Sequence, residues 1–205
     1  MGGGGTKVGF PPVVEFGVPR KSRHIEAMSI LLREALFTDA AEIGEVHALA
    51  WQETYEGLLP RSLVQRQTVE SRATAWARLL ADATQSRLRV VVAQVGPRKV
   101  GFGSGGPQRS EALSAQGYDA EIEAIYVRAQ FQGGGIGHSI MRWMARRLLA
   151  DGHHGVSLWV LRDNARARTF YERLGGVEVA DREEVRPEAT LFEVAYGWSD
   201  LRSLA

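Results

Sequence analysis

The chain of 205 residues contains no cysteine. Without a thiol it cannot form a disulfide framework, a thiolate metal site or an acyl-cysteine intermediate. The five histidines lack the spacing of a ligand set, so we expect no metal site. An excess of charge of one sign is also missing, because 25 basic and 24 acidic residues leave a net charge of +1. This balance favours neither nucleic acid nor an anionic membrane as a partner.

Long apolar runs are absent as well. No run approaches the roughly 20 residues that a helix needs to span a bilayer, and the first 27 residues lack the apolar segment of a signal peptide. We therefore expect no membrane association and a cytoplasmic location. With 44% apolar residues the chain can bury one sizeable core, whereas two domains would be cramped.

The start of the chain differs in composition from the rest. It holds a run of four glycines and proline-containing stretches without an apolar period. We interpret residues 1–27 as an N-terminal extension, either flexible, an expression remnant or the product of an upstream start, and residues 28–205 as the domain. The alternative is that the apolar residues of 13–16 form a strand that fixes this segment.

A glycine-rich turn between a strand and a helix is the most informative feature of the sequence. Residues 121–127 form the expected strand, and apolar residues repeat every four positions over 136–148, as in a helix packed on a sheet. Glycine occupies positions 133, 134, 135 and 137. Glycines let the backbone turn tightly and direct N–H groups at one point, where the following helix adds the positive end of its dipole. The turn therefore predicts a phosphate site.

The spacing of these glycines excludes the two commonest phosphate-binding patterns. A dinucleotide fingerprint or a Walker loop would require glycine at His138 or Ile140. The pattern that fits is Q-x-x-G-x-G, written here as Gln132, Gly135 and Gly137. It resembles the acetyl-CoA pyrophosphate loop of the GNAT superfamily of N-acetyltransferases.

A second segment extends the resemblance. Residues 160–176 read as a strand, then Asn164, then a helix in which Tyr171 follows Phe170, then glycine, which is similar to the second GNAT motif. The two motifs together cover about a third of the chain. The resemblance implies an α/β protein with the GNAT fold: a mixed, mostly antiparallel central sheet flanked by helices. Its central strands, here 121–127 and 155–161, would splay apart to admit the pantetheine arm.

Periodicity predicts the remaining elements. We expect strands at 30–33, 88–95, 100–105, 177–180 and 190–196, and helices at 39–55, 69–80 and 167–174. Asp39 and Glu42 have the spacing of a capping box at the start of the first helix. The polar segment 107–118 is predicted to be a loop.

The resemblance also assigns residues to acetyl-CoA. Backbone groups of Ile125 and Val127 would pair with the pantetheine amides, and Asn164 would contact the same arm. The full set of candidate cofactor-binding residues is Ile125, Tyr126, Val127, Gln132, Gly133, Gly134, Gly135, Ile136, Gly137, His138, Asn164 and Arg168. The family usually carries basic residues between the glutamine and the glycine, where this chain has Gly133 and Gly134. Backbone N–H groups alone would then hold the phosphates, so we expect weaker cofactor binding than usual.

The reaction must move two protons. An amine has a pKa near 10 and arrives protonated, and the thiolate that leaves must be reprotonated. Glu121 and Glu123 lie two apart on a strand, so they share a face and are candidate bases; each should raise the pKa of the other. Tyr171 corresponds to the general-acid tyrosine of the family. The alternatives are that Tyr171 simply packs, and that the carboxylates form a solvated face or a salt bridge to Arg128.

Candidate acceptor-binding residues lie on the first helix. His47, Trp51 and Tyr55 recur at i, i+4 and i+8, and the segment 51–60 is similar to the part that lines the acceptor pocket in many small-molecule GNAT enzymes. We select Trp51, Tyr55 and Glu53, because an aromatic and acidic lining suits a cationic amine. The alternative is that the aromatic residues belong to the core.

The sequence thus predicts an acetyl-CoA-dependent N-acetyltransferase. The expected acceptor is a primary amine of a small molecule, such as a polyamine or an amino acid, attacked directly in a ternary complex. The alternatives are acetylation of a protein or peptide N-terminus or lysine, and a non-catalytic acyl-CoA sensor. The resemblance also suggests a homodimer that uses the final strand and Trp198.

Overall fold

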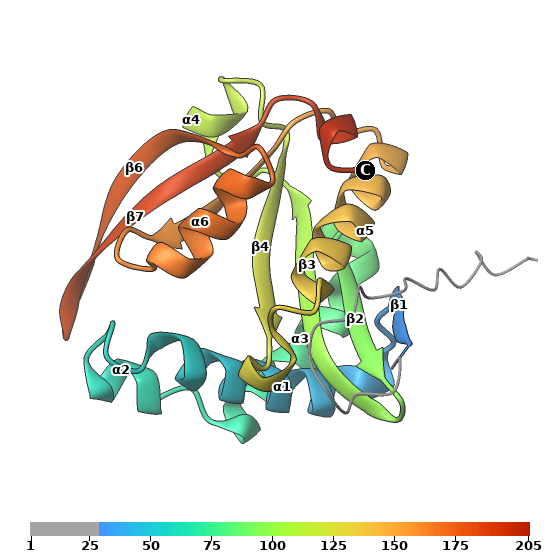
Figure 1. The fold of residues 1–205 in the computed structure, drawn as a ribbon, viewed down its shortest axis with the longest axis vertical. Helices are drawn as coiled ribbons and strands as arrows, with labels where there is room; N and C mark the ends of the chain where they lie inside the picture. The colour runs from blue at the N-terminus through green and yellow to red at the C-terminus, as the bar shows by residue number, and fades with distance from the viewer. Residues whose placement is uncertain (1–28) are drawn as a thin grey trace, which may run out of the picture.

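The computed structural model describes residues 29–205. The predicted extension 1–27, its alternative strand at 13–16 and the predicted domain start at Met28 lie outside the described residues. The described chain folds around one open sheet of seven strands in the order β1-β2-β3-β4-β5-β7-β6 (Figure 1). Neighbouring strands are antiparallel except β4 and β5, which are parallel. The predicted mixed, mostly antiparallel sheet is confirmed.

The elements follow one another along the chain with short connections. The strands are β1 Ile30–Glu34, β2 Arg89–Val95, β3 Arg98–Pro107, β4 Ala120–Val127, β5 Val156–Leu161, β6 Val177–Arg186 and β7 Ala189–Trp198. The α-helices are α1 Ala40–Tyr55, α2 Arg61–Gln65, α3 Val69–Ser86, α4 Glu111–Ser114, α5 Ile136–Ala150 and α6 Ala165–Arg173. Single 3-10 turns occur at Phe37–Asp39, Ala129–Phe131 and Leu201–Ser203.

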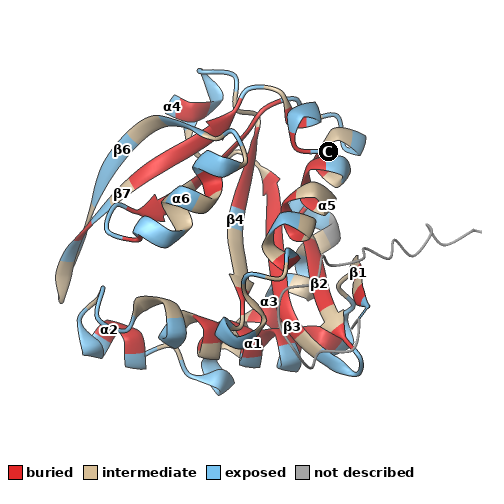
Figure 2. Ribbon diagram, in the orientation of Figure 1, coloured by how far each residue is buried: buried red, intermediate tan, exposed pale blue. Residues whose placement is uncertain are grey.

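Helices cover both faces of the sheet around its centre, which explains why a strand such as β2 is buried on both sides (Figure 2). On β2, Val91 and Ala93 contribute to the core under α5, whereas Val90 and Val92 contribute to the core under α1 and α3. All four side chains are buried, as alternation on a two-sided sheet requires.

Within residues 29–205 no helix combines the length and apolarity that crossing a membrane requires.

The centre of the sheet opens between β4 and β5. These strands pair only at Ala120 with Val156 and at Glu121 with Ser157. The register between β3 and β4 shifts at the next position, which leaves Glu123 as the extra residue of a bulge. A bulge bends its strand and re-aims side chains. The predicted splay of the central strands is therefore present, and it places an unpaired edge of β4 beside α5 and α6 (Figure 1).

Several local predictions are wrong. The capping box is absent, because the Asp39 carboxylate accepts from Leu36 N–H at 2.7 Å and from Arg33, while Glu42 pairs with Lys99. The expected loop 107–118 contains α4, and α2 was missed, since helices of four or five residues carry no readable period.

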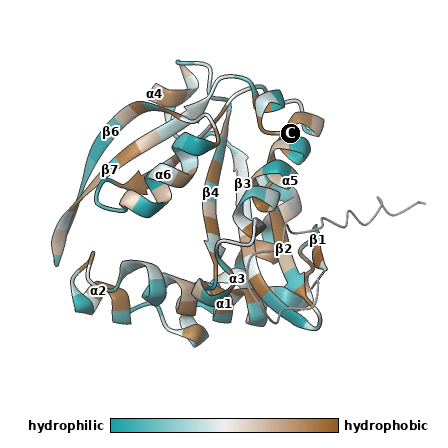
Figure 3. Ribbon diagram, viewed as in Figure 1, coloured by the Kyte–Doolittle hydropathy of each residue, from teal (hydrophilic) through white to brown (hydrophobic). Residues whose placement is uncertain are grey.

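The last two strands are longer than predicted. Both β6 and β7 have ten residues, and β6 is largely hydrophilic (Figure 3), so hydropathy alternation does not reveal its length. The predicted homodimer stays a prediction, but the structure places the two features that were expected to form it. The strand β7 lies between β5 and β6, and Trp198 is buried, with its Nε1 donating to the Leu174 carbonyl at 2.9 Å. Trp198 and both edges of β7 are therefore occupied within the chain, although Phe192 on the face of β7 is exposed.

Candidate active site

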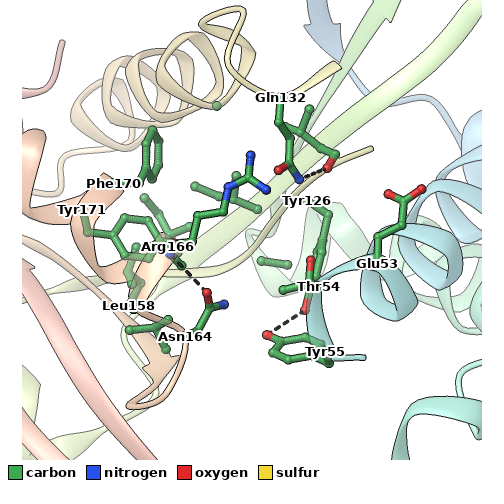
Figure 4. A pocket seen from close by; sticks show the side chains of 18 of the residues that line it. Glu53, Thr54, Tyr55, Tyr126, Gln132, Leu158, Asn164, Arg166, Phe170 and Tyr171 are labelled. Atoms are coloured by element: carbon green, nitrogen blue, oxygen red, sulfur yellow. Dashed lines mark hydrogen bonds between the residues drawn. The ribbon is translucent and has the colours of Figure 1, made fainter. Parts of the chain in front are cut away.

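A cavity of about 660 Å³ occupies the opening between β4 and β5 (Figure 4). Its walls come from the end of α1, β4, the glycine turn, β5 and the first half of α6. Most predicted site residues line it: Glu53, Tyr55, Glu123, Ile125, Tyr126, Val127, Gln132, Gly133, Gly135, Gly137, His138, Asn164 and Tyr171. The two sequence motifs therefore form opposite walls of one cavity.

The glycine turn has the backbone geometry that its sequence requires. Gly133 has φ of 82° and Gly135 has φ of 83°, a region that residues with a side chain rarely adopt. A Cβ atom on Gly137 would lie 3.2 Å from the Phe170 ring, so this position also favours glycine. Gln132 Nε2 donates to the Val127 carbonyl at 2.6 Å and ties the turn to the end of β4. The N-terminus of α5 is thereby held against the cavity, where its N–H groups suit an anion.

The opposite wall presents Tyr171 from α6. Asn164 begins this helix, since its Oδ1 accepts from the Ala167 N–H at 3.1 Å. The Tyr171 ring packs on Phe170 and Trp198, with centroids 5.3 and 6.2 Å away. Burial raises the pKa of the Tyr171 hydroxyl, so it keeps its proton at neutral pH. A protonated phenol facing the cavity can act as a proton donor.

The two predicted bases share an arginine but not the cavity. Arg109 binds buried Glu121 through two hydrogen bonds of 3.0 and 2.7 Å, and its Nε lies 3.7 Å from Glu123. Glu123 alone lines the cavity. Burial raises the pKa of Glu123; Arg109 opposes that shift and Glu121 adds to it. The proposed alternative of a salt bridge to Arg128 is wrong for both carboxylates, since Arg128 pairs with Glu53.

Of the three residues predicted to bind the acceptor, Tyr55 and Glu53 line the cavity and Trp51 does not. Tyr55 lines the cavity, with its hydroxyl 3.4 Å from that of Tyr126. Trp51 is not a lining residue; it packs against the Tyr55 ring at 4.3 Å in the adjoining aromatic cluster. Glu53 lines the cavity, but its carboxylate accepts from Arg128 Nε at 3.0 Å and from the Ala129 N–H at 2.7 Å. The Glu53 carboxylate is thus already bonded within the chain, and its contact with an acceptor stays a prediction.

Three predicted cofactor-binding residues do not line the cavity. Gly134 is half-buried in the turn, and Ile136, the first residue of α5, is buried in the core. Arg168 lies away from the cavity, because its guanidinium donates to the Tyr196 hydroxyl at 3.1 Å and to Glu178 at 3.2 Å.

The sequence interpretation also missed residues of the wall. They are Thr54, Leu58, Ile122, Ala124, Ala129, Leu158, Trp159, Val160, Asp163, Ala165, Arg166, Ala167 and Phe170. Helical spacing could have found one of them, since Arg166 lies one turn before Phe170, the aromatic residue of the second motif.

Comparisons with known proteins agree with this geometry. The model of the acetyltransferase (GNAT) family matches residues 51–176. The chain is 31% identical over 176 residues to YuaI of Bacillus subtilis strain 168, described as an uncharacterized N-acetyltransferase. That alignment covers 85% of this chain and 96% of the relative.

Solved structures share the fold. PaiA N-acetyltransferase from Thermoplasma acidophilum, in complex with coenzyme A, superposes with a TM-score of 0.65 at 18% identity, over 83% of this chain and all of that one. YncA of Salmonella typhimurium, solved with acetyl-CoA, gives 0.61 at 18% identity, over 84% and 94% of the two chains. By its family model, its relative and its fold, this chain belongs to the GNAT family and is an acetyl-CoA-dependent acyltransferase.

Proposed function

We propose that the enzyme transfers the acetyl group of acetyl-CoA to a primary amine of a small molecule by direct attack in a ternary complex. The observation that carries this proposal is the single cavity lined by the glycine turn, by Glu123 and by Tyr171. A phosphate-binding turn, a carboxylate with a raised pKa and a protonated phenol then face one space. The chain has no cysteine to carry the acetyl group, which also supports direct attack.

In this mechanism each side chain handles one proton. Glu123 accepts a proton from the ammonium group, directly or through a water molecule, and frees the lone pair of the amine. The amine nitrogen forms the new bond to the thioester carbonyl carbon, and the carbon–sulfur bond breaks. Tyr171 donates its proton to the leaving sulfur. The products are the N-acetylated amine and free CoA.

The structure around the far end of the cavity supports a small acceptor. Arg66, just after α2, donates to Glu188 in the β6–β7 turn at 2.5 Å. Behind this ion pair, Leu63 of α2 packs in one cluster with Leu161 and Leu191. We call these five residues the acceptor arch. None of the five lines the cavity, but their apolar cluster packs against Tyr55, which does. The arch joins α2 to the β6–β7 hairpin beside Tyr55, so it favours a slender molecule over a lysine on a folded protein surface.

The lining at this end supports a cationic acceptor. Glu123 and Asp163 contribute carboxylates, and Tyr55 and Tyr126 contribute aromatic rings. The ring of Trp159, a further lining residue, already carries the Arg182 guanidinium at 4.1 Å. A polyamine or another amine with more than one charge would find both kinds of partner here, since ammonium groups bind carboxylates and aromatic faces.

The test is release of free CoA from acetyl-CoA by the full chain, with polyamines, amino acids, aminoglycosides and peptide N-termini as acceptors. Turnover on a small amine supports the proposal and names the substrate class. Turnover on peptides alone would replace it with protein acetylation. Calorimetric binding of acetyl-CoA without turnover on any amine would favour the sensor.

A further inference from the structure

The glycine turn lacks the positive side chains that phosphates of a CoA molecule usually require. Gly133 and Gly134 stand between Gln132 and Gly135, so this wall provides backbone N–H groups and no cationic side chain. Of the carboxylates that line the same cavity, Glu53 is paired with Arg128 and Glu123 lies beside Arg109, whereas Asp163 has no basic partner among the described residues and adds its negative charge to the cavity. A ligand with several phosphate charges needs a cation here to offset this repulsion.

One arginine meets this need. Among the described residues that line the cavity, Arg166 is the single lysine or arginine. It belongs to the first turn of α6, which Asn164 caps, and its side chain extends from that helix across the cavity toward Gln132 (Figure 4). The guanidinium thus reaches from the wall that holds Tyr171 toward the wall that holds the glycine turn.

The Arg166 guanidinium is not committed to an acid of the protein. Within residues 29–205 it has no carboxylate partner, although its neighbours do: Arg162 pairs with Asp181 at 3.4 Å and Arg168 with Glu178 at 3.2 Å. Arg166 is also exposed, so a ligand can reach it without displacing packed side chains. An exposed arginine that is directed into the cavity, and that has no carboxylate partner among the described residues, is poised to bind an anion.

We propose that Arg166 binds a phosphate of acetyl-CoA and supplies the charge that the glycine turn lacks. The phosphate site would then have two walls: N–H groups at the start of α5, and a guanidinium fork from α6. Since α6 also carries Tyr171, the same contact would bring the cofactor against the proton donor. This inference rests on the use of acetyl-CoA alone, so it stands or falls independently of the amine acceptor.

The test is calorimetric titration of the full chain and of its R166Q variant with CoA, dephospho-CoA and pantetheine. We expect R166Q to weaken CoA binding about 10- to 100-fold, the effect of losing a charge-assisted hydrogen bond, with pantetheine affinity unchanged. An equal loss for dephospho-CoA assigns the contact to the diphosphate, and a loss confined to CoA assigns it to the 3′-phosphate. R166K should restore part of the affinity, because lysine keeps the charge without the fork.

The matched control is R173Q, which removes an exposed arginine from the other end of the same helix. It should bind CoA as the wild type does. Added salt should weaken CoA binding in the wild type and in R173Q, and less steeply in R166Q, because one screened ion pair is missing. If R166Q keeps wild-type affinity and salt dependence, or if R166Q and R173Q weaken binding equally, the assignment of Arg166 is wrong.

Discussion

At the scale of single residues, the position of Tyr171 allows a sharp test of the proposed proton donor. Replacing Tyr171 by phenylalanine removes one hydroxyl and keeps the ring that packs on Phe170 and Trp198. If Tyr171 protonates the leaving sulfur, we expect kcat to fall about 100-fold or more, with the Kd for CoA unchanged. Steady-state kinetics and calorimetry measure the two quantities.

The control for this change is Tyr196→Phe, which deletes the same atom from a neighbouring ring outside the cavity. The Tyr196 hydroxyl donates to Glu172 at 2.6 Å, so this variant should lose some stability but little kcat. Tyr55 is the competing donor, because it also faces the cavity. A larger loss of kcat in Tyr55→Phe than in Tyr171→Phe would reverse the assignment.

The Arg109 side chain affects the other proton transfer, in which Glu123 accepts a proton from the amine. It is the cation whose charge lowers the pKa of Glu123 against the effect of burial. In Arg109→Gln we expect the pKa of Glu123 to rise further, because the cation that opposes the effect of burial is gone. A base works only when deprotonated. On acidification the variant should therefore lose activity at a higher pH than the wild type does. The measurement is the acidic limb of kcat/KM against pH, with one amine used throughout.

Two further variants make this result decisive. Arg202→Gln removes an exposed arginine that pairs with Asp200 far from the cavity, and its acidic limb should match the wild type. Glu123→Gln should remove most of the activity across the pH range. An acidic limb that stays in place in Arg109→Gln would mean that Glu123 is not the base.

At the scale of elements, the glycine turn can be separated from general backbone strain. Gly135 immediately precedes α5 with φ of 83°, and Gly152 follows the same helix with φ of 91°; a Cβ at either would meet no atom within 4 Å. Alanine at either position should therefore lower the free energy of unfolding by a similar amount, about 1–2 kcal/mol. Only Gly135→Ala should weaken CoA binding, because it alone displaces N–H groups that face the cavity. Equal CoA affinity in the two variants would remove the turn from the site.

Elements with a strong local signal could be predicted from the sequence. The strand at 121–127 and the helix at 136–148 match β4 and α5 closely, because an apolar period and a run of glycines mark both. The bulge at Glu123 could not be read, since it depends on the register with β3. For the same reason the sequence did not separate Glu123, which faces the cavity, from Glu121, which binds Arg109 behind it.

Side-chain partners from distant elements were the other unpredictable part. Glu53 has the chemistry of an amine ligand, yet the fold brings Arg128 to it from beyond β4. The family motif indicated Arg168, but the hydrogen bond to Tyr196 holds its guanidinium away from the cavity and leaves Arg166 to face it. Such choices depend on tertiary contacts that no local pattern encodes.

At the scale of the whole molecule, the two apolar layers on either side of the sheet hold one buried titratable group whose effect on stability can be isolated. His47 of α1 lies against the Tyr126 ring at 4.8 Å, and its Nδ1 accepts from Trp76 Nε1 at 3.1 Å. Burial, with the charge of Arg72 adding to it, lowers the pKa of His47 from its ordinary value of 6.5 to about 3. His47 therefore joins α1, α3 and the sheet as a neutral ring.

This depressed pKa makes the fold sensitive to acid. Between pH 6.5 and 3 the unfolded chain binds a proton that the folded chain does not, so the His47 contribution is complete above pH 6.5 and is lost as the pH falls. At about 1.4 kcal/mol per unit of pKa, the loss between pH 7 and pH 4 is roughly 3 kcal/mol. Urea unfolding at the two pH values measures it.

Comparison with His47→Asn isolates this effect from that of the carboxylates, which titrate alike in both proteins. Asparagine can still accept a hydrogen bond from Trp76 Nε1 but does not titrate. Between pH 7 and pH 4 the free energy of unfolding should therefore fall by about 3 kcal/mol less in the variant than in the wild type. The surface change His138→Gln should leave the wild-type loss intact. If His47→Asn is as acid-sensitive as the wild type, the acid sensitivity arises outside the packing of α1 and α3 on the sheet, and the ion pairs at its edges become the next place to look.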